Sequence, residues 1–160
     1  MKKMFEIERK FLVKSTSFKE GSARKMTIKQ GFLNLDPQRT VRVRIKGGDA
    51  YLTVKGITDE QGVKRFEWET KIAVEEAETL LELCDGGYLE KTRFEVPVSG
   101  HIYEVDEFHG QNEGLLVAEI ELEEVDESFE KPEWLGEEVT GDNRYYNSQL
   151  IKQPLSLIHI

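Results

Sequence analysis

Three charged residues near the start of the chain have the types and spacing of a binding site. Glu6, Glu8 and Lys10 follow one another at intervals of two, and apolar residues occupy most of the alternate positions. Because successive side chains of a β-strand point to opposite faces, the three charged groups would share one face. Clustered carboxylates suit a hard divalent cation, and ammonium groups suit an anion. The stretch therefore predicts a strand with a binding face.

The same alternation recurs in later segments, and the two signs of charge are segregated. The in-phase bases are Arg42, Arg44, Lys55, Lys91 and Arg93, and the later in-phase acids are Glu104, Asp106, Glu119 and Glu121. One interpretation is an antiparallel sheet with a solvated face, but such a face usually mixes in Ser, Thr, Gln and Asn. We favour a closed barrel with a polar lumen, in which polyphosphate and a divalent metal would neutralise the crowded charges.

About eight segments show the period-two pattern of strands. They span residues 5–13, 25–35, 40–48, 50–56, 63–71, 89–98, 101–108 and 116–125. Gly47 and Gly48 predict a hairpin turn. A helix is predicted within residues 70–87, and Asp142 is the expected N-cap of a second, short helix. The apolar exterior of a barrel built from these strands would need helices packed over it.

The overall composition limits the class of protein. The chain has 160 residues and a net charge of −9, which favours one domain and argues against a general nucleic-acid binder. The single cysteine, Cys84, excludes an internal disulfide and a cysteine metal site. The charged start is unlike a signal peptide, and no apolar stretch is long enough to span a bilayer. We therefore expect a cytoplasmic protein without a membrane or nucleic-acid partner.

The last six residues, LSLIHI, differ in character from the charged stretch before them. They match the translation of a transposon-type sequencing adapter, so we interpret residues 155–160 as a non-native tail. Residues 1–154 are then expected to form a single domain. The alternative is a short apolar tail that packs on that domain.

The run Glu6-Ile7-Glu8-Arg9-Lys10 resembles the ExExK signature of the CYTH superfamily, whose members are also called triphosphate tunnel metalloenzymes. Further motifs follow in the same order: Arg42 with Arg44, TVK at 53–55, Arg65 with Glu67 and Glu69, EKTRF at 90–94, YEVDEF at 103–108, AEIELE at 118–123 and GEEVTGDNRYYNSQL at 136–150. The similarity covers nearly the whole chain to about residue 150. It looks closest to the short bacterial members that act as inorganic triphosphatases.

The resemblance implies an α+β fold, an eight-stranded antiparallel closed β-barrel or tunnel with a charged lumen and a few helices outside. Residues 1–154 would form this single CYTH-like domain. The implied metal ligands are Glu6, Glu8, Glu119 and Glu121, with Glu104 and Asp106 helping to place a second ion. The implied phosphate-binding residues are Lys10, Arg42, Arg44, Lys55, Arg65, Arg93 and Arg144, the last in a helix that closes one tunnel mouth. Lys91 and Glu8 are the expected catalytic residues.

The expected reaction is hydrolysis of inorganic triphosphate (tripolyphosphate) to pyrophosphate and phosphate, with Mg²⁺ or Mn²⁺ as cofactor. Within the enzymes, the alternative is a nucleoside triphosphate phosphohydrolase or an adenylate cyclase. Outside them, it is a non-catalytic polyphosphate-binding module. Phe32 stands where similar short members often have tyrosine, which bears on the preference for tripolyphosphate over nucleotides. The sequence leaves the oligomeric state open, a homodimer included.

Overall fold

The computed structural model describes residues 5–155 of the chain. Its elements are β1 (Phe5–Val13), η1 (Thr16–Gly21), β2 (Arg24–Asn34), β3 (Arg39–Lys46), β4 (Asp49–Thr58), β5 (Lys64–Ile72), α1 (Val74–Glu82), β6 (Tyr88–Val98), β7 (His101–Phe108), η2 (Gly110–Asn112), β8 (Leu116–Glu121), β9 (Leu135–Glu138), η3 (Asn143–Tyr145) and α2 (Asn147–Lys152). All eight predicted strands are present, the helix predicted within residues 70–87 is α1, and the second predicted helix corresponds to η3 and α2. The short strand β9 was not predicted.

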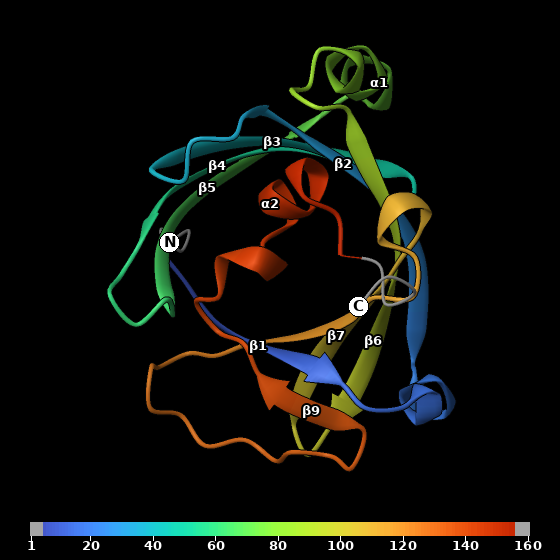
Figure 1. The fold of residues 1–160 in the computed structure, drawn as a ribbon, viewed down its shortest axis with the longest axis vertical. Helices are drawn as coiled ribbons and strands as arrows, with labels where there is room; N and C mark the ends of the chain where they lie inside the picture. Colours follow the sequence, from blue (N-terminus) through green and yellow to red (C-terminus); the bar gives the residue numbers. More distant parts are fainter. Residues whose placement is uncertain (1–4, 156–160) are drawn as a thin grey trace.

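Strands β1 to β8 form a closed antiparallel barrel, which confirms the predicted fold (Figure 1). The strand order is β5-β4-β3-β2-β6-β7-β8-β1, and β1 pairs again with β5 to close the ring. Closure uses a short ladder in which Glu6 lies opposite Arg65. Further along β1, where the ladder with β5 has ended, β9 pairs with Phe11 and Val13. The ninth strand therefore lies outside the eight-stranded ring.

The apolar faces of the strands point outward and are covered by the remaining chain. On one side, Ala77 and Leu81 of α1 pack against Val43 and Ala50 of the barrel. On the other side, a larger buried cluster joins η1, the barrel and the segment before β9; it includes Phe11, Phe18, Phe94, Tyr103, Ile120 and Trp134. Burying a side chain of this size stabilises the fold by roughly 1.5–3 kcal/mol. The predicted cover is thus confirmed, although only part of it is helical.

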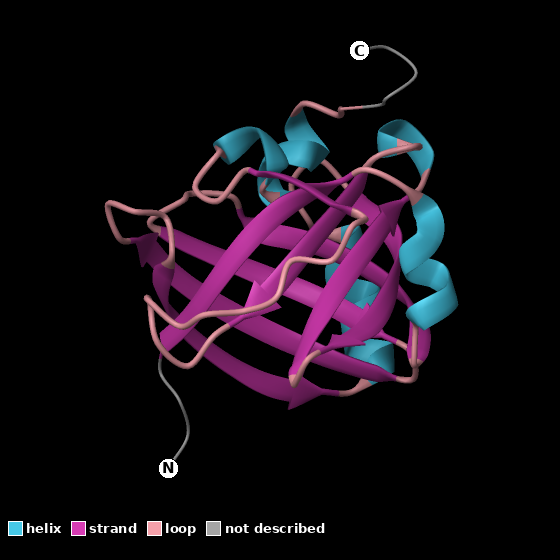
Figure 2. Cartoon of the chain, turned by 90° about the horizontal axis from the view of Figure 1, so that it is seen from below, coloured by secondary structure: helices cyan, strands magenta, loops and turns pink. Residues whose placement is uncertain are grey.

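The C-terminal helix α2 lies within the ring of strands and not on its outside (Figure 1). Leu150 of α2 is fully buried against Leu89, Phe108 and Val117, which belong to the inward faces of β6, β7 and β8. Seen from the side, short helices gather at the end of the barrel from which the chain leaves toward its C-terminus (Figure 2). This end of the lumen is therefore filled by apolar side chains.

The predicted local signals agree with the structure. Gly47 occupies the β3–β4 turn at a φ of 60°, a left-handed conformation that suits glycine. The Asp142 side chain accepts a hydrogen bond from the backbone N–H of Arg144 and so caps η3, which leads into α2. Among the helices in residues 5–155, none has the length and apolar character needed to cross a bilayer.

Leu155 is the one residue of the predicted tail that the structure describes. Its backbone N–H donates to Asn112 Oδ1 at 2.8 Å, and its side chain packs beside the cluster around Leu150. Residues 156–160 lie outside the described part of the chain. The interpretation of 155–160 as a non-native tail therefore stays a prediction.

Candidate functional site

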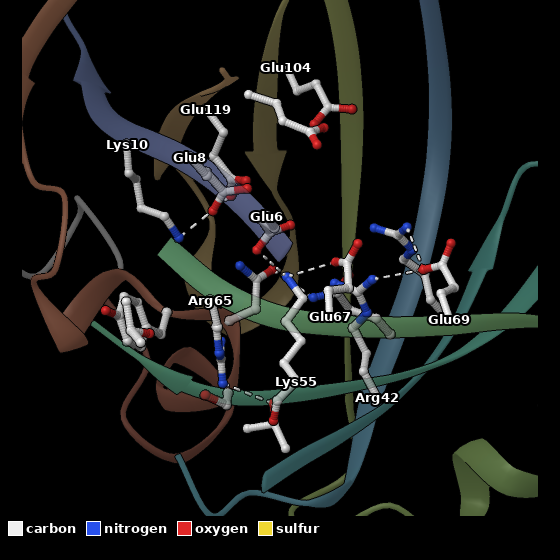
Figure 3. A pocket seen from close by; sticks show the side chains of 18 of the residues that line it. Glu6, Glu8, Lys10, Arg42, Lys55, Arg65, Glu67, Glu69, Glu104 and Glu119 are labelled. Carbon is white, nitrogen blue, oxygen red and sulfur yellow. Dashed lines mark hydrogen bonds and ion pairs between the residues drawn. The ribbon is translucent and has the colours of Figure 1, made fainter. Parts of the chain in front are cut away.

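The lumen contains a cavity of about 280 Å³ whose lining is mainly charged (Figure 3). The charged residues that line it are Glu6, Glu8, Lys10, Arg42, Arg44, Lys46, Lys55, Arg65, Glu67, Glu69, Lys91, Arg93, Glu104, Glu119 and Glu121. They come from seven of the eight barrel strands. A strand can contribute two or three of them, because residues at intervals of two share the inward face. The structure thus brings nearly all the predicted site residues into one cavity.

One wall of the cavity is an arginine pair on β3. Arg42 Nη2 and Arg44 Nη2 lie 3.5 and 3.8 Å from Glu69 Oε2, and Arg42 also donates to Thr53 Oγ1 at 3.2 Å. Among the described residues, neither Nε atom has a hydrogen-bond partner, although both are buried. Burial, then the nearby Arg42 and Arg93 charges, lower the pKa of Arg44 to about 9. An anion in the lumen would supply the missing acceptors and relieve the repulsion.

The facing wall is a carboxylate cluster from β1 and β8. Burial, then the charges of Glu119 and Glu6, raise the pKa of Glu8 well above its usual value. Burial would also raise the pKa of Glu119, but Lys10 and a hydrogen bond from Glu8 outweigh it and hold that pKa well below the usual range. The surroundings thus favour the protonated form of Glu8 and the ionised form of Glu119.

Two lysines also neutralise this cluster. Lys55 Nζ lies 2.8 Å from Glu6 Oε1, and Lys10 Nζ lies 3.5 Å from Glu119 Oε1 (Figure 3). Burial raises the pKa of Glu6, but the Lys55 charge and the hydrogen bonds with Lys55 and Glu67 together outweigh burial, so the pKa of Glu6 is lowered. Glu6 and Glu119 thus each have a lysine partner.

The carboxylate cluster has the donor chemistry that a divalent metal requires. Within residues 5–155, no three acidic, histidine or cysteine side chains already converge as a complete metal site. Mg²⁺ is commonly held by one or two protein carboxylates together with water and substrate phosphate oxygens, so a complete protein cage is not needed. The hard oxygen donors of Glu6, Glu8 and Glu119, which lie close enough for the charges of Glu119 and Glu6 to raise the pKa of Glu8, fit such an ion.

Lys91 and Arg93 of β6 meet Asp106 of β7 in a buried ion-pair network. Asp106 Oδ2 lies 2.7 Å from Lys91 Nζ, and Arg93 reaches Oδ1 through Nε at 2.8 Å and Oδ2 through Nη2 at 2.9 Å. The side chains of Lys91 and Asp106 are each 1% exposed. Asp106 itself does not line the cavity, although the sequence predicted that it would help to place a metal ion. The structure instead gives both of its oxygens cationic partners.

Of the remaining predicted residues, three line the cavity and one does not. Glu104 and Glu121 line the cavity, and Glu104 pairs with Arg93 at 3.3 Å. Arg65 also lines it and donates to Thr40 Oγ1 at 3.0 Å. Arg144, expected to reach a phosphate, is 68% exposed and pairs with Asp142 at 2.7 Å. It does not line the cavity, because η3 turns its side chain toward solvent.

Several lining residues were not assigned a role from the sequence. They are Gln30, Thr40, Lys46, Glu67, Glu69, Tyr146, Asn147 and Ser148. Lys46 continues the interval of two that runs through Arg42 and Arg44, so its position could have been extrapolated. Tyr146 and Asn147 follow η3 and enter the lumen only because α2 folds into the barrel, which no local pattern indicates.

Comparison with known proteins decides the family. The family model described as CYTH domain matches residues 4–150. The chain belongs to the CYTH domain family. Two relatives named inorganic triphosphatase are similar to this CYTH chain over most of its length. The Acetivibrio thermocellus protein is 46% identical over 150 residues, which cover 93% of this chain and 94% of the relative.

The second relative, from Nitrosomonas europaea, is 36% identical over 151 residues, covering 92% of this CYTH chain and 97% of the relative. The crystal structure of the inorganic triphosphatase NE1496 superposes with a TM-score of 0.66 at 34% identity, covering 94% of this chain and 95% of that one. The ExExK resemblance is therefore confirmed across the whole barrel.

Proposed function

We propose that this CYTH protein is a metal-dependent triphosphatase that hydrolyses inorganic triphosphate to pyrophosphate and orthophosphate inside its barrel. The observation that carries the proposal is a single lumen in which an arginine wall faces a carboxylate cluster. Such a lumen matches a polyanion that binds together with a cation. Names of relatives that cover more than nine-tenths of the chain support the same substrate.

In the proposed complex, the bases grip the phosphate oxygens. Arg42 and Arg44 offer forked guanidinium donors, including the two buried Nε–H groups. Lys10, Lys55, Arg65 and Arg93 would complete this set, and Lys10 and Lys55 would exchange part of their contact with glutamate for contact with phosphate. We do not include Arg144, because its side chain is exposed and paired with Asp142.

For the cofactor we propose Mg²⁺ or Mn²⁺, held by Glu6, Glu8, Glu119 and Glu121. When bound, the metal would neutralise charge on the phosphoryl oxygens and help to activate water. Glu8 would bind the cation in its deprotonated form, because a carboxylate ligand must be deprotonated. Asp106 acts in this proposal by orienting Lys91 and Arg93 and not as a ligand.

The catalytic work of the chain itself is positioning and charge neutralisation. Lys91, held at 1% exposure by Asp106, would donate to an oxygen of the reacting phosphate or of the leaving pyrophosphate. Glu8 would orient the attacking water and accept its proton. The transition state of phosphoryl transfer spreads negative charge over several oxygens, and the arginines and lysines are placed around that volume.

The deciding experiment is phosphate release from tripolyphosphate and from ATP, side by side, with Mg²⁺, Mn²⁺ or EDTA. We expect metal-dependent release mainly from tripolyphosphate. Preference for ATP with phosphate release would indicate a nucleotide hydrolase, and cyclic AMP with pyrophosphate would indicate a cyclase. Tight binding without turnover would indicate a binding module. The Phe32→Tyr variant, assayed in parallel, tests whether this cavity-lining position influences the choice of substrate.

A cytoplasmic location and a homodimer are also part of the proposal, and both stay predictions. Size-exclusion chromatography with light scattering tests the oligomeric state directly. Fractionation of cells that express the native gene tests the location.

A further inference from the structure

Lys91 Nζ has two oxygen partners with well-defined geometry. It lies 2.7 Å from Asp106 Oδ2 and 2.8 Å from Asn147 Oδ1. An ammonium group carries three N–H donors and no acceptor, so both partners must accept. With two donors engaged among the described residues, the third is left for a group in the cavity that Lys91 lines. The two acceptors therefore set the direction of the remaining N–H.

Each of these acceptors is held in turn by another buried donor. Arg93 binds Asp106 through two parallel hydrogen bonds of 2.8 and 2.9 Å. Gln30, which is 1% exposed, donates from Nε2 to Asn147 Oδ1 at 2.8 Å. Because Lys91 can only donate, the orientation of the Asn147 amide is fixed by chemistry, and that of Gln30 follows from it. Four side chains thus support one ammonium group.

Asn147 differs from the others because it does not belong to the barrel wall. It is the first residue of α2, which is held in the barrel mouth by the buried Leu150 and by a 3.3 Å hydrogen bond from Asn112 Nδ2 to Leu150 O. The preceding residues contact the other lysine: Lys10 Nζ donates to Tyr145 O at 3.3 Å and lies 5.4 Å from the centre of the Tyr146 ring.

We propose that Asn147 is a positioning residue for the triphosphatase reaction, acting through Lys91. Its Oδ1 directs the Lys91 ammonium group, so the C-terminal segment completes the active site as well as filling the barrel mouth. The inference rests on the proposed function, in which Lys91 contacts the reacting phosphates. A displacement of about 1 Å at a reacting group can cost about 10²-fold in rate, so an acceptor at this position has a measurable effect.

Kinetics of two Asn147 variants test this role. Asn147→Leu keeps the size of the side chain but removes the acceptor, and we expect kcat for tripolyphosphate to fall by about 10- to 100-fold with KM within about 3-fold of wild type. Asn147→Asp keeps an acceptor oxygen, so kcat should return to within about 3-fold of wild type, with a higher KM because the added charge opposes a polyanion. Lys152→Ala, an exposed change in the same helix, is the matched control.

A merely structural role is excluded by measuring the unfolding temperature of each variant, which should stay close to that of wild type for Asn147→Asp and Asn147→Leu. If Asn147→Leu lost activity only in proportion to a loss of folded protein, or if Asn147→Asp were no better than Asn147→Leu, the proposal would be overturned. A wild-type kcat in Asn147→Leu would overturn it as well.

Two further readouts separate this inference from the proposed function. In a double-mutant cycle, Asn147→Leu should change the residual rate of Lys91→Met by less than about 2-fold, whereas independent roles would multiply the losses. The ammonium resonance of Lys91, observed with ¹⁵N-lysine labelling, should be protected in wild type and Asn147→Asp and lost in Asn147→Leu. Because that signal does not require turnover, it tests the positioning even if wild type fails to cleave tripolyphosphate. Equal protection in all three proteins would contradict it.

Discussion

Glu8 and Glu119 are diagonal neighbours across the β1–β8 ladder, in which Glu8 pairs with Glu121 and Glu119 pairs with Lys10. Burial and the charges of Glu119 and Glu6 raise the pKa of Glu8, whereas Lys10 helps to hold the pKa of Glu119 well below its usual range. The two pKa values are therefore shifted in opposite directions. A divalent cation would satisfy both carboxylates, which is why this pair is central to the proposed metal site.

Glu119→Gln should lower the rate of tripolyphosphate hydrolysis by at least about 100-fold, because it removes a proposed ligand and the partner of Lys10. Phosphate release as a function of Mg²⁺ concentration measures the effect. Glu123→Gln is the control, since Glu123 follows in phase on the same segment but is exposed. An unchanged Mg²⁺ requirement in Glu119→Gln would remove this residue from the site.

Arg44→Lys should raise KM for tripolyphosphate by about 10- to 100-fold with a smaller effect on kcat. Lysine keeps the charge but loses the buried Nε–H donor, and a hydrogen bond to a charged group contributes about 1.5–3 kcal/mol. Arg39→Lys, on the same strand but with a 64% exposed side chain, should leave KM unchanged. Steady-state kinetics at fixed ionic strength distinguish the two. Equal rises in KM for the two variants would show that the effect comes from replacing any arginine by lysine and not from losing the buried Nε–H donor of Arg44.

Arg144→Ala should keep kcat and KM within about 2-fold of wild type, because a largely exposed ion pair such as Arg144 with Asp142 contributes little. The assay with tripolyphosphate is sufficient. A large rise in KM would show instead that Arg144 turns inward when substrate binds, as the family resemblance originally implied.

Gly62→Ala should destabilise the fold by about 2–4 kcal/mol, through backbone strain and a steric clash together. Gly62 has a φ of +75°, and a Cβ there would lie 2.5 Å from Gly141 Cα. Gly47→Ala is matched for strain alone, since its φ is +60° and nothing lies within 4 Å of the added Cβ, so a loss of about 1 kcal/mol is expected. Urea unfolding measures both, and equal losses would argue against the contact.

Alkaline pH should weaken the fold through Cys84, whose pKa burial raises from 9.0 to about 11. Below about pH 9 the thiol is protonated in both states and contributes no pH dependence. Between those two pKa values the unfolded chain loses the proton first, so stability falls as pH rises. Urea midpoints from pH 8 to 11 should show this slope, and Cys84→Ala should reduce it. A folded thiol that reacts rapidly with Ellman's reagent at pH 8 would contradict the burial.

The alternation of charged and apolar residues was sufficient to predict the barrel, because an interval of two places side chains on one face regardless of tertiary detail. The alternation could not predict which charged side chains would pair with one another. Asp106 is in phase with Glu104, yet Lys91 and Arg93 engage both of its oxygens, and only the register of β6 with β7 determines that. The period-two pattern predicts which face of the strand a side chain lies on, whereas the register between neighbouring strands determines which side chains are in contact.

The C-terminal part of the site was less accessible from sequence. Strand β9 is only Leu135–Glu138 and forms through backbone pairing with β1, so it has no period-two pattern of its own. Asn147 meets Lys91 because α2 is folded into the lumen, a consequence of the buried Leu150 and its barrel partners. Residues at such positions are found from packing and not from spacing.

Strand β1 carries Glu6 and Glu8, yet every strand it pairs with comes later in the chain: β5, β8 and β9. The first strand to leave the ribosome must therefore wait for more than a hundred further residues before its ladder with β8 can form. Contacts so distant in sequence favour slow folding, because the entropy of closing a long loop is lost before the pairing compensates for it. During synthesis, the acidic cluster is assembled only after residue 121 has emerged, so partly made chains lack the complete charged lumen.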